Sequence, residues 1–228
     1  MMRLAVICAL LGFLVAGCSS FNQPSLQAHT PTANWSIQYS PGMPTRPTAG
    51  GLGTWYFDFP TDPNYPACID SPNANCNSVN YVTDSYSSPA TQSVTMTFQI
   101  LTTGTPIFNY VMETDNTCHT PPSVRLFLER RNDDFSQEFY RWWANPISYE
   151  LQPTSGNVTM TVPLAPDQWS SVYGKAGNYD AAAFAGFQDT LSNLGHVGMT
   201  FGGGCFFGHG VNVSAGTARF ILIGYAIN

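Results

Sequence analysis

Alternation of apolar and polar residues is the dominant pattern of this chain. It is clearest at 94–100, where valine, methionine, phenylalanine and isoleucine alternate with threonine and glutamine. A period of two indicates a half-buried β-strand. Weaker strand patterns occur at 55–59, 107–112, 124–128, 139–143, 147–151, 158–164, 197–201 and 206–211. Residues 218–227 are apolar on both faces, which predicts a central strand, and residues 35–39 could dock as an edge strand.

One segment predicts a helix. Between 181 and 194, large apolar residues recur at spacings of three and four: Phe184, Phe187, Leu191 and Leu194. Asp180 can cap its start, and Gly195 suits its end. By contrast, residues 60–89 are punctuated by proline and asparagine and predict a long loop region.

About eight or nine strands with one short helix predict an all-β fold. We expect an antiparallel two-sheet β-sandwich of the jelly-roll type over residues 51–228, with an up-and-down barrel as the alternative. Residues 195–211 join the helix to the last strand and contain seven glycines. This density indicates tight turns or the close approach of another chain or a ligand.

The N-terminus indicates export. Residues 1–17 carry Arg3 and then an apolar run too short to span a bilayer, as in a signal peptide. The end of this run, Leu14-Val15-Ala16-Gly17-Cys18, resembles the lipobox of bacterial lipoproteins. The resemblance implies cleavage before Cys18, acylation of Cys18 (palmitate among the acyl chains) and a membrane anchor; Ser19 after it implies the outer membrane. The alternative is an ordinary secretory signal with a chance cysteine.

Residues 18–50 are rich in proline, serine and threonine and predict a tether. Loss of Cys8 and lipidation of Cys18 would leave four of the six cysteines. An even number in an oxidising compartment predicts two disulfides with three possible pairings. Cys68 and Cys76 share one loop and suit a local bridge, which leaves Cys118 for Cys205. A metal site of Cys118, His119, Cys205 and His209 is the alternative, although no pair has typical ligand spacing.

Charge restricts the partners. The formal net charge is −6, and charged residues make up 10% of the chain against roughly 25% in typical domains. Such a chain is a poor match for nucleic acid or for an anionic membrane surface. No sequence feature indicates an oligomeric state.

The run from Phe139 through Val158–Leu164 and Asp167-Gln168-Trp169 to Val197–Gly203 and Ala218–Ile227 resembles a galactose-binding-domain-like jelly roll. Many carbohydrate-binding modules share that fold. The resemblance rests on strand order and aromatic placement, and it implies a possible structural calcium, for which Asp58 and Asp115 are candidates.

Adjacent tryptophans provide the candidate ligand site. On a strand, Trp142 and Trp143 point to opposite faces. We expect Trp142 in the core, and Trp143 with Arg141 on a groove where a sugar ring could stack on the indole. Arg125 and Asn145 complete the predicted ligand-binding set; Arg125 and Arg141 could instead pair with Glu129 and Glu138. The alternative is that both indoles are structural.

Enzymatic signals are weak. The sequence has no G-x-S-x-G, H-E-x-x-H or phosphate-binding loop. Glu129, Glu138 and Glu150 could supply a glycosidase pair, and His196 and His209 flank the glycine run. We therefore expect a glycan-binding, envelope-anchored lipoprotein rather than an enzyme. The alternatives are a structural or protein-interaction lipoprotein and a carbohydrate-active enzyme.

The anchor can be tested at Cys18. Acyl chains contribute about 0.8 kcal/mol per buried methylene, so several chains hold a protein firmly on a membrane. Cys18→Ser should therefore move the protein from the membrane fraction to the soluble fraction. A Cys18→Ser protein that stays in the membrane pellet through high-salt and carbonate washes would contradict the assignment.

Overall fold

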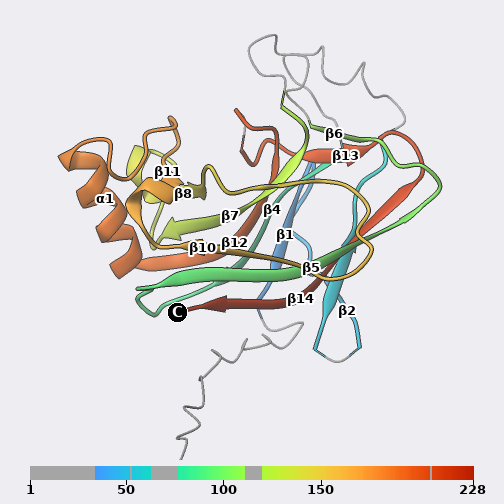
Figure 1. The fold of residues 1–228 in the computed structure, drawn as a ribbon, viewed down its shortest axis with the longest axis horizontal. Helices are drawn as coiled ribbons and strands as arrows, with labels where there is room; N and C mark the ends of the chain where they lie inside the picture. Colours follow the sequence, from blue (N-terminus) through green and yellow to red (C-terminus); the bar gives the residue numbers. More distant parts are fainter. Residues whose placement is uncertain (1–33, 52, 63–76, 111–119, 206) are drawn as a thin grey trace, which may run out of the picture.

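The computed structural model describes residues 34–51, 53–62, 77–110, 120–205 and 207–228. Two antiparallel sheets pack face to face, and one α-helix, α1 (Ala181–Ser192), lies at one end beside β8 and β11 (Figure 1). The large sheet has the order β11 (Trp169–Ser170), β8 (Arg141–Ala144), β7 (Ser123–Arg130), β12 (Leu194–Gly202), β4 (Ser78–Ser85), β13 (Val211–Val213), β6 (Phe108–Tyr110). In addition, β1 (Ser36–Ser40) pairs with β4, and β9 (Tyr149–Glu150) pairs with β7.

The small sheet has the order β10 (Val158–Pro163), β5 (Ser93–Thr103), β14 (Thr217–Ile227), β3 (Trp55–Asp58), β2 (Thr48–Ala49). Short 3₁₀ helices, η1 (Glu138–Tyr140) and η2 (Pro166–Gln168), precede β8 and β11. The expected all-β, antiparallel two-sheet sandwich with one helix is confirmed.

Phenylalanine rings fill the space between the sheets. In the small sheet, Phe220 stacks on Phe57 and on Phe98 at centroid distances of 5.4 and 5.0 Å. Phe201 of the large sheet meets Phe57 and Phe220 edge-on, at 5.5 Å in both cases. Edge-to-face pairs contribute about 0.5–1.5 kcal/mol beyond their buried area. These contacts therefore join the two sheets.

A buried hydrogen bond also links the sheets. The hydroxyl of Tyr225 on β14 donates to the carbonyl oxygen of Gly198 on β12 at 3.1 Å. Trp35 covers this bond, with its ring 5.3 Å from Tyr225 and 5.1 Å from Trp55. A Cβ at position 198 would collide with the carbonyl oxygen of Val82 on β4. Only glycine therefore allows β12 and β4 to approach this closely.

The helix covers the interior with one face. Asp180 accepts a hydrogen bond from the backbone N–H of Ala183 at 2.8 Å, which confirms the expected cap. Phe187 is fully buried and meets Trp142 at 5.1 Å, whereas Phe184, expected on the same apolar stripe, is 48% exposed. Gly195 does not end the helix: Asn193 is the C-cap, and Gly195 lies in β12, where a Cβ would come within 2.6 Å of the Cα of Arg131.

Three expected segments are corrected. Residues 60–89, expected to be a long loop region, contain β4, which is paired on both sides. The sequence pattern did not reveal this strand because Val79 and Val82 break the period-two alternation. Residues 139 and 140 belong to η1, so the strand expected from 139 begins at Arg141. The strand expected at 206–211 begins only at Val211, and Phe206 lies outside the described residues.

The tether prediction is wrong for its last part. Trp35 and Ile37 belong to the core, and β1 pairs with β4 as the alternation at 35–39 allowed. Residues 1–33, with the expected signal peptide and Cys18, lie outside the described residues, as do Cys68, Cys76 and Cys118. In the part of the chain that is described, no helix is both long and apolar enough to cross a membrane.

The two faces of α1 can be distinguished by mutation. Phe187→Ala removes a buried ring and leaves a cavity against Trp142, so we expect a loss of about 3–5 kcal/mol in the free energy of unfolding. Phe184→Ala is the matched control and should change it by less than about 0.5 kcal/mol. Chemical denaturation of both variants measures this. Equal losses would mean that the helix is rotated from its assigned orientation.

Candidate functional site

The large sheet presents a polar outer face, on the side away from the small sheet. Core residues of β12 alternate with outward residues His196, Gly198 and Thr200. The strand register sets these outward residues in cross-strand rows: His196 lies between Ser85 and Glu129, and Thr200 lies between Tyr81 and Arg125. Directly paired residues share a face of a sheet. The outer face is therefore where chemistry-bearing side chains gather.

A cavity of about 570 Å³ opens over one side of this face, and we call it the Trp143 cavity. Strands β4 and β8, the 172–174 turn and the described residues between 204 and 209 all contribute to it. Its lining residues are Tyr81, Arg141, Trp143, Asn145, Val172, Tyr173, Gly174, Gly204, Cys205, Phe207 and His209. Three of the four residues expected to bind ligand, Arg141, Trp143 and Asn145, thus lie around one cavity.

Trp143 is less accessible than the sequence suggested. Trp142 points into the core as expected, and Trp143 points outward, but Trp143 is only 4% exposed. Its indole packs against Phe127 at 5.2 Å and Phe207 at 6.3 Å. The expected open stacking surface on Trp143 is therefore wrong for the described residues. Its Nε1–H is fully buried and has no hydrogen-bond partner among them.

Arg125 lies behind the cavity wall. Its guanidinium donates to the carbonyl oxygen of Ala144 at 3.0 Å and stacks on the ring of Phe207 at 4.3 Å. The side chain is 7% exposed. Burial lowers the pKa of Arg125 to about 10, which still leaves it charged at neutral pH.

Arg141 organises the loop between β7 and η1. Its guanidinium forms an ion pair with Asp133 at 2.8 Å, donates to the carbonyl oxygen of Phe135 at 3.1 Å, and stacks on that ring at 4.5 Å. Asp133 also accepts from the backbone N–H of Phe135 at 2.9 Å. The alternative that Arg141 pairs with Glu129 and Glu138 is wrong. The acceptor is Asp133, which the turn brings back over the strand.

Phe135 is held in a costly conformation. Its φ is +66°, in the left-handed region, which costs a bulky residue on the order of 1–3 kcal/mol. The ring is nevertheless 64% exposed, so core packing does not explain the conformation. Such strain at an exposed aromatic side chain is a signal of function.

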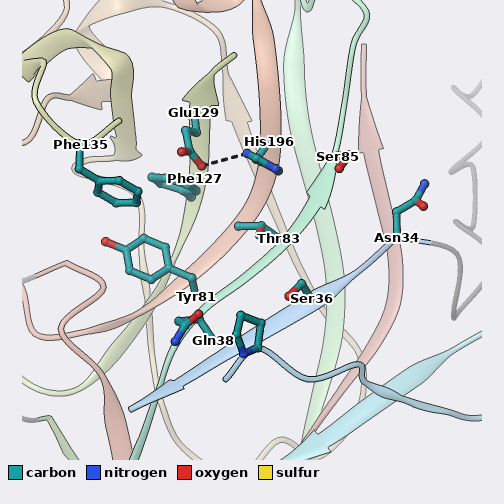
Figure 2. A pocket seen from close by; sticks show the side chains of 11 residues that line it. Asn34, Ser36, Gln38, Tyr81, Thr83, Ser85, Phe127, Glu129, Phe135 and His196 are labelled. Atoms are coloured by element: carbon teal, nitrogen blue, oxygen red, sulfur yellow. Dashed lines mark ion pairs between the residues drawn. The ribbon is translucent and has the colours of Figure 1, made fainter. Parts of the chain in front are cut away.

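A second hollow adjoins the first; we call it the His196 pocket (Figure 2). It has a volume of about 270 Å³. Figure 2 shows Phe135, Phe127 and Tyr81 gathered on one side and Ser36, Thr83 and Asn34 on the other. Gly198 contributes no side chain between Thr83 and Phe127, with which it is paired in the sheet. Tyr81 lines both hollows, which therefore adjoin, and we call the two together the groove.

Glu129 and His196 provide the charge of this pocket. The Nδ1 atom of His196 lies 3.2 Å from a carboxylate oxygen of Glu129. The hydrogen bond that His196 donates to the carboxylate of Glu129, opposed by burial, raises the pKa of His196 above its usual value. Burial raises the pKa of Tyr81 to about 12, so its hydroxyl remains a donor at neutral pH. Burial lowers the pKa of His209 in the neighbouring cavity.

Several residues considered for other chemistry have structural partners instead. Glu138 pairs with Lys175 at 3.1 Å, and Glu150 is exposed on β9. Asp58, a calcium candidate, instead forms a two-bond ion pair with Arg219 at 2.6 and 2.9 Å; Asp115 lies outside the described residues. Cys205 is disulfide-bonded and is not a thiolate ligand. Over the described ranges, no group of three His, Cys, Asp or Glu residues is placed to hold a metal ion.

Sequence reasoning missed the exposed aromatic residues of the groove. Tyr173 is 78% exposed and lines the Trp143 cavity, next to Gly174 in a tight turn. Phe135 stands over the His196 pocket, and Phe207 covers Arg125. The sequence signal that could have found such a residue is an aromatic side chain beside a turn-forming glycine or asparagine, as in Tyr173-Gly174. A period-two search passes over it because such residues lie outside strands.

Comparison with known proteins gave no matching family model and no matching curated relative. Among solved structures, one match is described as "xylan-binding module CBM15". It has 12% sequence identity and a TM-score of 0.38, and the match covers 86% of this chain and 95% of that one. At this TM-score the likeness carries no conclusion about a ligand or a site.

The two histidines of the groove should titrate on opposite sides of the usual value of about 6.5. Because the folded pKa of His196 is raised, its pairing with Glu129 stabilises the fold fully below pH 6.5, and this stabilisation is lost as pH rises through the folded pKa. NMR titration, assigned with His196→Asn and His209→Asn, should give a pKa above 6.5 for His196 and below 6.5 for His209. Glu129→Gln should lower the pKa of His196 and leave that of His209 unchanged. An unchanged His196 pKa in Glu129→Gln would contradict the pairing.

Proposed function

We propose that this protein is an envelope-anchored lipoprotein whose β-sandwich binds a glycan in the groove on the outer face of the large sheet. The observation that carries the proposal is the pair of exposed aromatic side chains, Phe135 and Tyr173, beside two adjoining polar hollows. Sugar rings present flat C–H faces that stack on aromatic rings, while their hydroxyl groups need donors and acceptors around the rim.

The groove supplies both kinds of contact. Phe135 lines the His196 pocket, Tyr173 lines the Trp143 cavity, and Tyr81 lies between them in both linings. The indole N–H of Trp143 is an unpartnered donor among the described residues, and Glu129 is an acceptor. A pocket lined by apolar rings with a few placed polar groups is the usual form of a small-ligand site. The combined shape suits a chain of sugars rather than a single ring.

The strain at Phe135 favours binding over a structural role. Arg141 donates to the carbonyl oxygen of Phe135 at 3.1 Å, and Asp133 accepts from the backbone N–H of Phe135 at 2.9 Å. These two contacts hold the ring of Phe135 outward. A loop stabilised only for folding would turn this ring inward or place glycine there. Fixing an aromatic side chain before binding reduces the entropy lost when a ligand arrives.

The anchoring part of the proposal comes from the sequence alone. Residues 14–18 resemble a lipobox, which would place the domain on the bacterial envelope, at the outer membrane if Ser19 acts as the resemblance implies. A domain on a lipid anchor meets envelope polysaccharides and captured extracellular glycans. Both are consistent with a groove that is open to solvent.

A glycan array with the whole mature chain tests binding directly. Binding to one glycan class, with no turnover of that glycan, supports the proposal. Hydrolysis of a bound polysaccharide would favour the carbohydrate-active enzyme. No glycan binding would favour the structural or protein-interaction lipoprotein.

Removal of the exposed rings should weaken glycan binding without damage to the fold. Stacking contributes about 0.5–1.5 kcal/mol, so Tyr173→Ala should lower affinity for the array ligand roughly three- to tenfold. Phe135→Gly should lower it similarly and should keep or raise the melting temperature, since glycine adopts positive φ without strain. Calorimetric titration and thermal melting measure the two effects.

Tyr179→Ala is the control for these variants, because Tyr179 is exposed but lines neither hollow. Its affinity should equal that of the unaltered protein. If Phe135→Gly and Tyr173→Ala both bind as tightly as Tyr179→Ala, the groove is not the glycan site.

A further inference from the structure

Arg125 differs from three other basic residues on and around the large sheet, and from the exposed Arg131, which donates only to backbone carbonyl oxygens. Arg130, Arg141 and Lys175 each have a carboxylate partner, Asp189, Asp133 and Glu138 respectively. Arg125 is more than nine-tenths buried and has no acidic partner among the described residues. Burial is also the only cause found for its lowered pKa, with no carboxylate acting to raise it. A buried charge without a partner is costly, and proteins retain one mainly where it has a use.

Two other residues on the same face of the large sheet as Arg125 also have unsatisfied polar atoms. The Nε–H of Arg125 and the Nε1–H of Trp143 are buried without hydrogen-bond partners in the described part of the chain, as is the hydroxyl of Thr200. Thr200 is paired with Arg125 across β12 and β7. The three residues thus lie on one face of the large sheet, and Trp143 among them lines the Trp143 cavity. Together they would suit an acceptor with two oxygen atoms.

The described lining of the Trp143 cavity also contains no acidic residue. Asp133, behind Arg141, is already paired. The neighbouring His196 pocket contains Glu129 instead. The two ends of the groove therefore differ in charge: donors and a buried cation at one end, a carboxylate at the other.

We propose that the Trp143 cavity takes a carboxylate-bearing sugar, a uronic acid residue of a glycan, with its carboxylate directed toward the guanidinium of Arg125. A carboxylate matches the planar guanidinium with two parallel hydrogen bonds. Phe207 covers the guanidinium at 4.3 Å, so it both excludes water and forms the wall that the carboxylate must pass. This inference rests on the proposed glycan-binding function and specifies its ligand class.

The acidic character of the whole protein does not oppose this assignment. The formal charge of −6 is spread over the chain, and charges farther than about 8–10 Å are screened at physiological salt. A buried cation is screened far less. Long-range repulsion would slow the approach of a polyanion but would not remove the preference at the site.

The experiment compares uronate-containing glycans with the same glycans after reduction of their carboxyl groups to alcohols, with the whole mature chain in calorimetric titration. We expect the reduced glycans to bind at least tenfold more weakly. In Arg125→Met the two forms should bind equally, and the melting temperature should not fall, because the variant removes an unpaired buried charge. Arg125→Lys should keep part of the preference, since it retains the charge without the planar fork; it serves as the second variant if Arg125→Met does not fold.

Arg130→Met is the matched control, because Arg130 lies on the same strand but pairs with Asp189. It should keep the full preference for the uronate form. Equal binding of native and reduced glycans by the unaltered protein would overturn the uronate assignment and leave the glycan-binding function standing. The assignment would also be overturned if Arg125→Met kept the full preference for the uronate form, or if Arg125→Lys kept it where Arg125→Met does not fold. Binding of sulfated glycans alone would overturn it as well. Absence of binding to any glycan would instead contradict the proposed function itself.

Discussion

The inward-turned carbonyl of Gly198 is the constraint on which the arrangement of both sheet faces depends. It accepts the hydrogen bond of Tyr225, so it joins the large sheet to the small one in the middle of the core. Trp35 and Trp55 close around this bond and make the N-terminal strand part of the interior. On the opposite face, the missing side chain leaves space between Thr83 and Phe127, where the His196 pocket lies. One residue thus affects both the core and the groove.

The loops above the groove owe their shape to polar contacts rather than to apolar burial. Arg141 fixes the 133–135 turn through an ion pair, a hydrogen bond and a stacked ring. Phe207 rests on Arg125 and Trp143, in a loop that also contains the disulfide-bonded Cys205. Both loops present aromatic side chains at defined positions. Groups fixed in this way lose little entropy when a ligand binds.

The fold could be predicted from local pattern, and the site only in part. Period-two alternation located β5 and β10, and the run at 218–227, apolar on both faces, located β14. The spacing of Phe187 and Leu191 with Asp180 located α1. β4 escaped because its pairing on both sides, rather than its own pattern, makes it a strand. Strand alternation placed Trp143 and Arg141 on the outer face, but it could not show that Phe207 would cover Trp143. That contact comes from a loop distant in sequence, which no local pattern encodes.

Trp143 also differs from the other tryptophans in its surroundings. The chain has five tryptophans, and four of them, Trp35, Trp55, Trp142 and Trp169, belong to the core between the sheets. Trp143 alone lies on the other side of the large sheet, against Phe127, Phe207 and the cavity. A molecule that enters the cavity would change the surroundings of this indole and leave the other four in an unchanged environment. The intrinsic fluorescence of the protein therefore contains a single-residue optical reporter of the groove over a constant background, with no label required.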